Sequence, residues 1–202
     1  NFNTSFSGKD LLITRLQTGN SRQYAASSGF ANEATLASQV FGDTNTYNPT
    51  TGAVTLANTV VLDTLQYQFP LGEKGRAYIT ANAGVWDDIA NTLNPYFENN
   101  DGGNGSLSAF AQRNPIYRLG GGAGAGLRYA FSNNFEVSLG YLAGQASNPS
   151  GGAGLFDGNY SILGQLTYTS TDKRFGVGVT YNHAYFSPVS YTHLTLPTNR
   201  EV

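Results

Sequence analysis

The sequence predicts an all-β protein, an antiparallel transmembrane β-barrel of which only part is present. Three observations predict this class: apolar and polar residues alternate with a period of two, short and long connections alternate, and the composition is unusual. Only 12% of the 202 residues are charged, about half the share of a soluble domain, and the chain has 25 Gly, 13 Tyr and 12 Phe. A helical soluble protein would be rich in Leu, Ala, Glu and Lys instead. No apolar run approaches the ~18 residues of a membrane-spanning helix.

The clearest alternation runs from Gly124 to Gly144. Its apolar face carries Ala125, Leu127, Tyr129, Phe131, Phe135, Val137, Leu139, Tyr141 and Ala143, and Leu142 is the exception on the polar face. Ser132–Asn134 form a short turn of residues that tolerate tight backbone geometry. The pattern predicts a hairpin that pairs Tyr129 with Phe135 and places Arg128 opposite Glu136, a favourable cross-strand charge pair.

Three further hairpins follow the same pattern. They span Asn1–Gln17 with a turn at Gly8–Asp10, Thr64–Ala83 with a turn at Pro70–Gly75, and Ser161–Asn182 with a turn at Thr171–Lys173. The total is eight strands. Most are close in length to the strand of about 9–11 residues that crosses a bilayer when tilted. The remaining connections are long, and short turns on one side with long loops on the other are typical of an outer-membrane barrel.

Five aromatic residues of the apolar face lie beside the short turns: Phe69, Phe131, Phe135, Tyr168 and Phe175. A ring of aromatics at the boundary between membrane and water explains this placement, so we expect outer-membrane lipid to contact the apolar face. A soluble β-sandwich or lectin-like sheet also alternates, but its polar face meets solvent and carries more Lys and Glu. This alternative stays open at the level of the pattern.

The polar face is expected to line a water-filled pore for small hydrophilic solutes and ions. The predicted pore-lining residues are Arg15, Gln17, Gln66, Gln68, Arg76, Tyr78, Thr80, Asn82, Arg128, Glu136, Ser138, Gln165, Thr167, Thr180 and Asn182. The alternative is a small closed barrel with a structural or adhesive role, in which side chains fill the lumen. Inward glycines such as Gly126, Gly140 and Gly178 leave little to fill it, which favours the curved wall of a larger pore.

The long connection from Trp86 to Leu119 concentrates charge and is a candidate functional loop. We predict that it folds into the lumen as a constriction loop in which Asp87, Asp88, Glu98, Arg113 and Arg118 set a transverse field. Ser106–Gln112 is expected to make a helical turn or two, and the earlier connection contains a possible strand at Thr35–Phe41. The alternative is a solvated outer loop without a special role.

Several functions are not supported by the sequence. His183 and His193 are the only histidines and have no nucleophile setting, so we predict no enzyme. There is no Cys and no recognisable metal or cofactor site. A net charge of −2 with scattered Lys and Arg argues against nucleic-acid binding, which needs a basic face.

Short motifs resemble a known family. Gly8-Lys-Asp-Leu-Leu12, Tyr67-Gln-Phe-Pro-Leu-Gly72 and Arg113-Asn-Pro-Ile-Tyr-Arg118, followed by Gly120-Gly-Gly-Ala-Gly124, are similar to the barrel of cyanobacterial outer-membrane porins. These are the OprB-like carbohydrate-selective porins with an S-layer homology domain, also called iron uptake porins. The resemblance runs from about residue 1 to 187. It implies a homotrimeric barrel of about sixteen strands that passes carbohydrates, inorganic ions or iron.

The same resemblance divides the chain. Residues 1–188 are predicted to be a partial porin barrel, and residues 189–202 a non-native tail that fits no strand. Because the sequence contains no Met, we expect the natural chain to begin upstream, with the S-layer homology domain. Eight strands are about half of the implied barrel. A sheet that ends in mid-barrel has two unpaired edges, so we expect the 202-residue chain alone to form no stable pore.

Overall fold

The computed structural model describes residues 1–18, 46–47, 54–55, 60–94, 96–98, 105–106, 109–186 and 189–195. The chain divides into two compact units, which are described separately. The sheet unit comprises Asn1–Thr14, Thr64–Leu93 and Ile116–Val202, and the loop unit comprises Arg15–Asp63 and Asn94–Pro115. The strand predicted at 35–41 lies outside the described residues.

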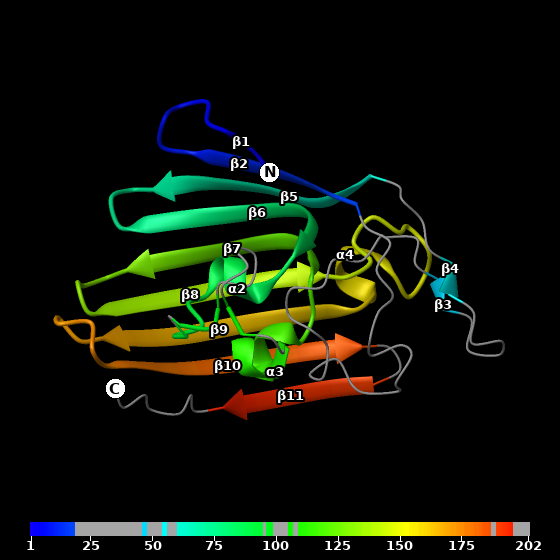
Figure 1. Cartoon of the computed structure of the whole chain (residues 1–202). Helices are drawn as coiled ribbons and strands as arrows, with labels where there is room; N and C mark the ends of the chain where they lie inside the picture. The colour runs from blue at the N-terminus through cyan, green and yellow to red at the C-terminus, as the bar shows by residue number, and fades with distance from the viewer. Residues whose placement is uncertain are drawn as a thin grey trace. The chain divides into compact units, whose positions relative to one another are not determined.

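A nine-stranded sheet dominates the fold, in the order β1-β2-β5-β6-β7-β8-β9-β10-β11 (Figure 1). Its strands are β1 Phe2–Thr4, β2 Leu11–Gln17, β5 Val61–Leu71, β6 Gly75–Gly84, β7 Gly122–Ala130, β8 Phe135–Ala143, β9 Tyr160–Thr169, β10 Gly176–Phe186 and β11 Val189–Thr195. A separate pair joins β3, Thr46–Tyr47, to β4, Val54–Thr55. The sheet is open, with β1 and β11 at its edges.

Helical structure is limited to single turns among the described residues. These are α2 Trp86–Ile89, α3 Ala109–Gln112, α4 Gly154–Asp157 and the 3-10 turn Pro115–Arg118. The helical turn predicted for 106–112 is present as α3, which begins at Ala109. No helix in the described part of the chain is long and apolar enough to cross a membrane.

The predicted all-β antiparallel class is confirmed, and all four predicted hairpins form. Their short turns lie at one end of the sheet and the long connections leave from the other (Figure 1). Two details differ from the prediction. Pro70 and Leu71 extend β5 rather than beginning the turn, and β11 pairs with β10 from Val189 to Thr195, where no strand was predicted.

The β7–β8 register also differs from the prediction. Arg128 lies opposite Ser138, and Glu136 lies opposite Ala130, and the Phe131 and Phe135 rings stack across the turn at 5.7 Å. The predicted register was therefore wrong by two residues. The ion pair nevertheless forms, with Arg128 Nε 3.5 Å from a Glu136 carboxylate oxygen, since diagonal neighbours on one face remain within reach of long side chains.

Burial on the two faces of the sheet is the inverse of that in a soluble protein. On β9, Ser161, Gln165 and Thr167 are buried, whereas Ile162 and Leu166 are 44% and 45% exposed. On β10, Thr180 and Asn182 are buried, whereas Val179 and Tyr181 are exposed. This arrangement, with buried polar residues and exposed apolar residues, is expected where the apolar face contacts lipid.

Aromatic rings form a row at each end of the outward, apolar face. At the short-turn end, Phe131, Phe135, Tyr168 and Phe175 contact one another in sequence, at centroid separations of 4.9–6.5 Å. At the long-loop end, Tyr160 stacks on both Tyr141 and Tyr185 at 5.7 Å, and Phe156 of α4 adds to the row at 5.8 Å from Tyr141. Two such rows match the paired aromatic girdles of outer-membrane barrels.

Candidate functional site

The long connection after β6 returns to the polar face of the sheet within the sheet unit. We call residues 86–93 and 116–119 the loop base. Its buried side chains Trp86, Ile89, Ala90, Ile116 and Tyr117 form a core with Tyr78, Leu142 and Leu163 from the strands. Leu142 and Leu163 are apolar residues on an otherwise polar face. Their contact with the loop base explains why they interrupt the alternation.

A break in the strand pattern leads the chain into the loop base. The β6 register shifts between Thr80 and Gly84, and Ala83 has a φ of 49°, in the left-handed region that residues other than glycine rarely adopt. The pairing of β6 with β7 is therefore regular only as far as Thr80, although the predicted alternation of faces continues through Ala83. This irregular end carries the chain out of the sheet and directly into α2.

Two glycines on neighbouring strands make room for α2. A Cβ added at Gly140 of β8 would lie 2.6 Å from Trp86 Cζ3, and a Cβ added at Gly126 of β7 would lie 2.7 Å from Ile89 Cγ2. Both contacts are closer than carbon atoms tolerate. We call this pair the glycine seat. The inward glycines Gly126 and Gly140 thus leave room for the loop base.

Two strand side chains, Gln165 and Thr180, hold other parts of the loop base through Tyr117 and Asn91. Tyr117 Oη donates to Gln165 Oε1 at 2.7 Å and lies 3.3 Å from the Thr180 hydroxyl, which also donates to Gln165 Oε1 at 2.9 Å. Gln165 Nε2 donates to the Asn91 carbonyl at 2.6 Å. The side chains of Tyr117, Gln165 and Thr180 are buried, so these hydrogen bonds are shielded from water.

Backbone carbonyls in and just after the 3-10 turn accept hydrogen bonds from a strand side chain and from the loop base itself. Asn182 Nδ2 donates to the carbonyls of Ile116 and Leu119, at 3.0 and 3.2 Å. The indole Nε1 of Trp86 also donates to the Leu119 carbonyl, at 2.8 Å. Asn182 and Trp86 are fully buried. The two ends of the long connection are thus tied to β10 and to each other.

Charged groups gather on the polar face towards the short-turn end. The Arg128 guanidinium donates from Nε to the Ile89 carbonyl at 2.9 Å, and its Cζ lies 5.8 Å from the Tyr78 ring centroid. Gln66 Nε2 donates to Thr80 at 3.1 Å and more weakly to Asp88 at 3.4 Å. A polar hollow of about 120 Å³ opens nearby, with Asn91, Asn134, Glu136, Thr167 and Thr169 among its lining residues.

The predicted pore-lining residues fall into two groups. Eight are buried: Gln66, Tyr78, Thr80, Ser138, Gln165, Thr167, Thr180 and Asn182. Seven are partly or fully exposed: Arg15, Gln17, Gln68, Arg76, Asn82, Arg128 and Glu136. Sequence periodicity could not separate these groups, because it assigns a face and does not show which part of that face another segment covers.

The predicted constriction residues are divided between the two units. Asp87, Asp88 and Arg118 belong to the sheet unit, whereas Glu98 and Arg113 belong to the loop unit, where they form an ion pair at 2.5 Å. Arg15 of the loop unit pairs with Asp63, so the charge of Asp63 is neutralised across neighbouring strands.

The turn before β2 contains a polar cluster that the sequence reading did not single out. The Asp10 carboxylate accepts hydrogen bonds from the Ser7 hydroxyl and backbone N–H, at 2.5 and 2.7 Å, and from Ser5 Oγ at 3.0 Å. Tyr67 Oη of β5 donates to it as well, at 2.8 Å. The hydrogen bond from the Ser7 hydroxyl is the main cause that holds the pKa of Asp10 well below its usual range.

Comparison with known proteins agrees with this geometry. Residues 1–201 match the carbohydrate-selective porin family, OprB. The chain belongs to that family. Its members are channels of the outer membrane, so the chain is part of an outer-membrane protein. The family is one of channels rather than of enzymes.

Two relatives of this porin are cyanobacterial. It is 38% identical over 192 residues to "Uncharacterized protein alr4550" of Nostoc sp., covering 90% of this chain and 32% of the relative. It is 35% identical over 198 residues to "Uncharacterized protein sll0772" of Synechocystis sp., covering 98% of this chain and 33% of the relative. The chain thus spans about a third of the length of these curated relatives. No solved structure matches it.

Proposed function

We propose that this segment is part of the wall of a porin that lets small hydrophilic solutes, carbohydrates among them, diffuse passively along its polar face. The observation that carries the proposal is the inverted burial of the two faces, with Ile162, Leu166 and Val179 open on one and Gln165, Thr167 and Thr180 covered on the other. An outward apolar face needs lipid, and an inward polar face needs water or polar solute.

The proposal assigns different roles to the two groups of polar-face residues. Side chains that remain accessible, such as Gln68, Arg76 and Glu136, contact the solute. Their amide, guanidinium and carboxylate groups can exchange hydrogen bonds with water for hydrogen bonds with sugar hydroxyls at little net cost. Buried members such as Thr180 and Asn182 support the loop base instead.

Finer assignments extend the same proposal. We propose from the family resemblance that the full-length protein also passes inorganic ions or iron. It would form a homotrimer of barrels with about sixteen strands each, with an S-layer homology domain upstream. The small closed barrel with an adhesive role receives less support. The glycine seat is filled by the loop base rather than by strand side chains, and the sheet of nine strands stays open.

The test is to reconstitute the full-length parent protein in planar lipid bilayers. If the protein passes small solutes, it should give stepwise conductance, and proteoliposomes that contain it should swell in neutral monosaccharides and more slowly in larger oligosaccharides. A barrel that is correctly folded, as shown by heat-modifiable migration, and that gives neither conductance nor swelling would refute the proposal. Ion conductance without sugar-driven swelling would restrict the proposal to ions.

A further inference from the structure

We propose that Gln165, Thr180 and Asn182, together with the glycine seat at Gly126 and Gly140, are positioning residues that fix the loop base against the barrel wall and thereby set the width of the solute path. The inference rests on the proposed porin function and deepens it. It assigns control of pore width to side chains that no solute touches, since the exposed fractions of the three polar residues are only 0–2%.

The hydrogen bonds of Gln165 and Asn182 in this role end on backbone atoms, and Thr180 donates to Gln165 Oε1. Gln165 binds the carbonyl of Asn91, and Asn182 binds the carbonyls of Ile116 and Leu119. A buried carbonyl that loses its donor costs about 1–3 kcal/mol. The loop base is therefore held at both of its ends, whatever side chains the rest of the connection presents.

The glycine seat determines how closely the loop base approaches the wall. Trp86 and Ile89 are fully buried, so neither side chain can swing aside if a methyl group is added beneath it. Ordinary contact between carbon atoms begins at roughly 3.5 Å, so a methyl at Gly140 would lift the Trp86 ring by about 1 Å. Because the ring lies on the polar face, that displacement is directed away from the wall and into the path.

A single added methyl group tests the proposal in the full-length parent. We expect Gly140→Ala to fold and to lower single-channel conductance by about a third, because the lifted loop base narrows the path. Adding Trp86→Leu to Gly140→Ala removes the ring that the methyl strikes, and the conductance should return towards that of the parent. A merely structural effect would lower the folded fraction and leave the conductance of each folded channel unchanged.

The matched control is Gly164→Ala on the neighbouring strand β9. A Cβ at Gly164 meets its nearest atom, Leu139 Cδ2, at 3.4 Å, close to ordinary contact and on the apolar face. Its conductance should equal that of the parent. If Gly140→Ala does not fold, Tyr117→Phe serves instead, because it removes only the hydroxyl that binds Gln165 and Thr180. We expect open-channel current noise to rise several-fold in that variant.

Hydrogen exchange separates this inference from the proposed function. The Ala90 amide donates to the Trp86 carbonyl at 2.7 Å, and a fixed loop base predicts slow exchange there in the folded parent. If the parent is silent in bilayers, the proposed function fails, and the exchange of this amide still decides whether the loop base is fixed. Fast exchange at Ala90, or parent-like conductance and noise in the folded variants, would overturn the proposal.

Discussion

Arg76 on β6 lies directly opposite Arg128 on β7 in the antiparallel register. Like charges in this position repel each other. Glu136 and the Ile89 carbonyl offset the charge of Arg128. Arg76 is exposed, makes one long hydrogen bond to Gln68 at 3.5 Å, and has no carboxylate partner among the described residues. It therefore contributes the uncompensated positive charge of this pair.

Neutralising Arg76 should make the channel less favourable to anions. For Arg76→Gln in the full-length parent, we expect the reversal potential in a potassium chloride gradient to move towards cation selectivity by about 5–10 mV. Arg76→Lys keeps the charge and should behave like the parent. An unchanged reversal potential in Arg76→Gln would show that Arg76 does not face the ion path.

A charge placed on the apolar face should destabilise the protein strongly. Leu139 is 51% exposed near the middle of β8. Arginine at the bilayer midplane costs about 2–4 kcal/mol, so Leu139→Arg should lower the free energy of unfolding in lipid bilayers by that amount. Gln68→Arg, on the polar face, is the control and should lower it by less, because water rather than lipid borders that face, even though Arg76 lies nearby. Equal stability of the two variants would contradict the assignment of the faces.

The turn held by Asp10 should be sensitive to acid. Its folded-state pKa lies below that of an ordinary carboxyl, so its contribution to stability is present above about pH 4 and declines as the pH falls towards the folded-state pKa. We expect Asp10→Asn to lower the urea midpoint at pH 7 and to differ less from the parent at pH 3. Lys9→Gln, in the same turn, should show no such pH dependence. An Asp10→Asn deficit that is as large at pH 3 as at pH 7 would argue against this role.

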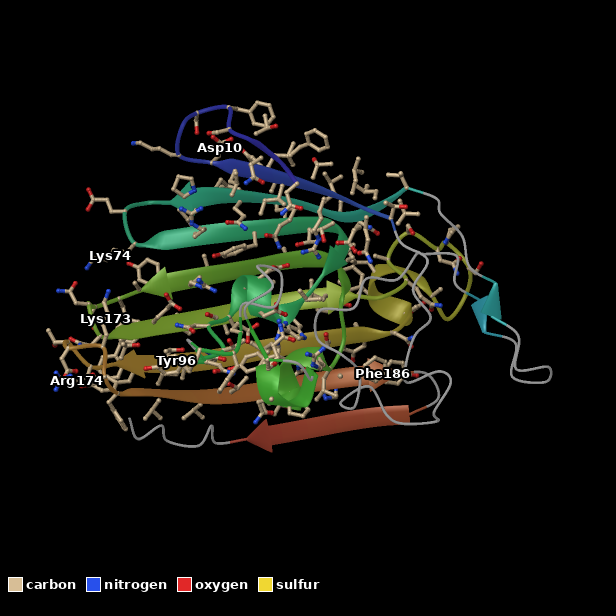
Figure 2. All side chains as sticks on the ribbon, viewed as in Figure 1. Asp10, Lys74, Tyr96, Lys173, Arg174 and Phe186 are labelled. Carbon is tan, nitrogen blue, oxygen red and sulfur yellow. The ribbon has the colours of Figure 1, made fainter. Side chains whose placement is uncertain are left out.

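The other charged residues in the short turns differ from Asp10 in their partners. Lys74, Lys173 and Arg174 lie with Asp10 at the short-turn end, far from Phe186 at the other end of β10 (Figure 2). Asp172 is hydrogen-bonded within its own turn. The Ser170 hydroxyl donates to it at 2.6 Å, and this hydrogen bond lowers the pKa of Asp172. The two carboxylates thus stabilise turns, whereas the three cations have no ion-pair partner within the described residues.

The 202-residue chain by itself should aggregate rather than insert as a pore. Strands β1 and β11 form the edges of an open sheet, and unpaired edges template association with other chains. Refolding in detergent followed by size-exclusion chromatography should yield large assemblies without channel activity. A monodisperse monomer with porin conductance would contradict this expectation.

Period-two alternation was sufficient to predict eight strands of the sheet, their faces and the short turns between them, but not β11. It could not predict what covers Gln165, Thr180 and Asn182, because that depends on contacts between residues 48 to 66 positions apart in the chain. The apolar exceptions Leu142 and Leu163 were the available signal, since an apolar residue on a polar face needs an apolar partner. The two-residue register error at Arg128 arose because face assignment alone does not distinguish registers that differ by two.

The central claim is that the polar face borders a water-filled path and the apolar face does not. Cysteine substitutions test this claim most directly. The comparison is between Gln68→Cys on the polar face and Leu139→Cys on the apolar face, in the full-length parent under continuous current recording. We predict that a bulky, charged, membrane-impermeant thiol reagent lowers the current through Gln68→Cys and leaves Leu139→Cys unchanged. Block of Leu139→Cys with no effect on Gln68→Cys would contradict the account.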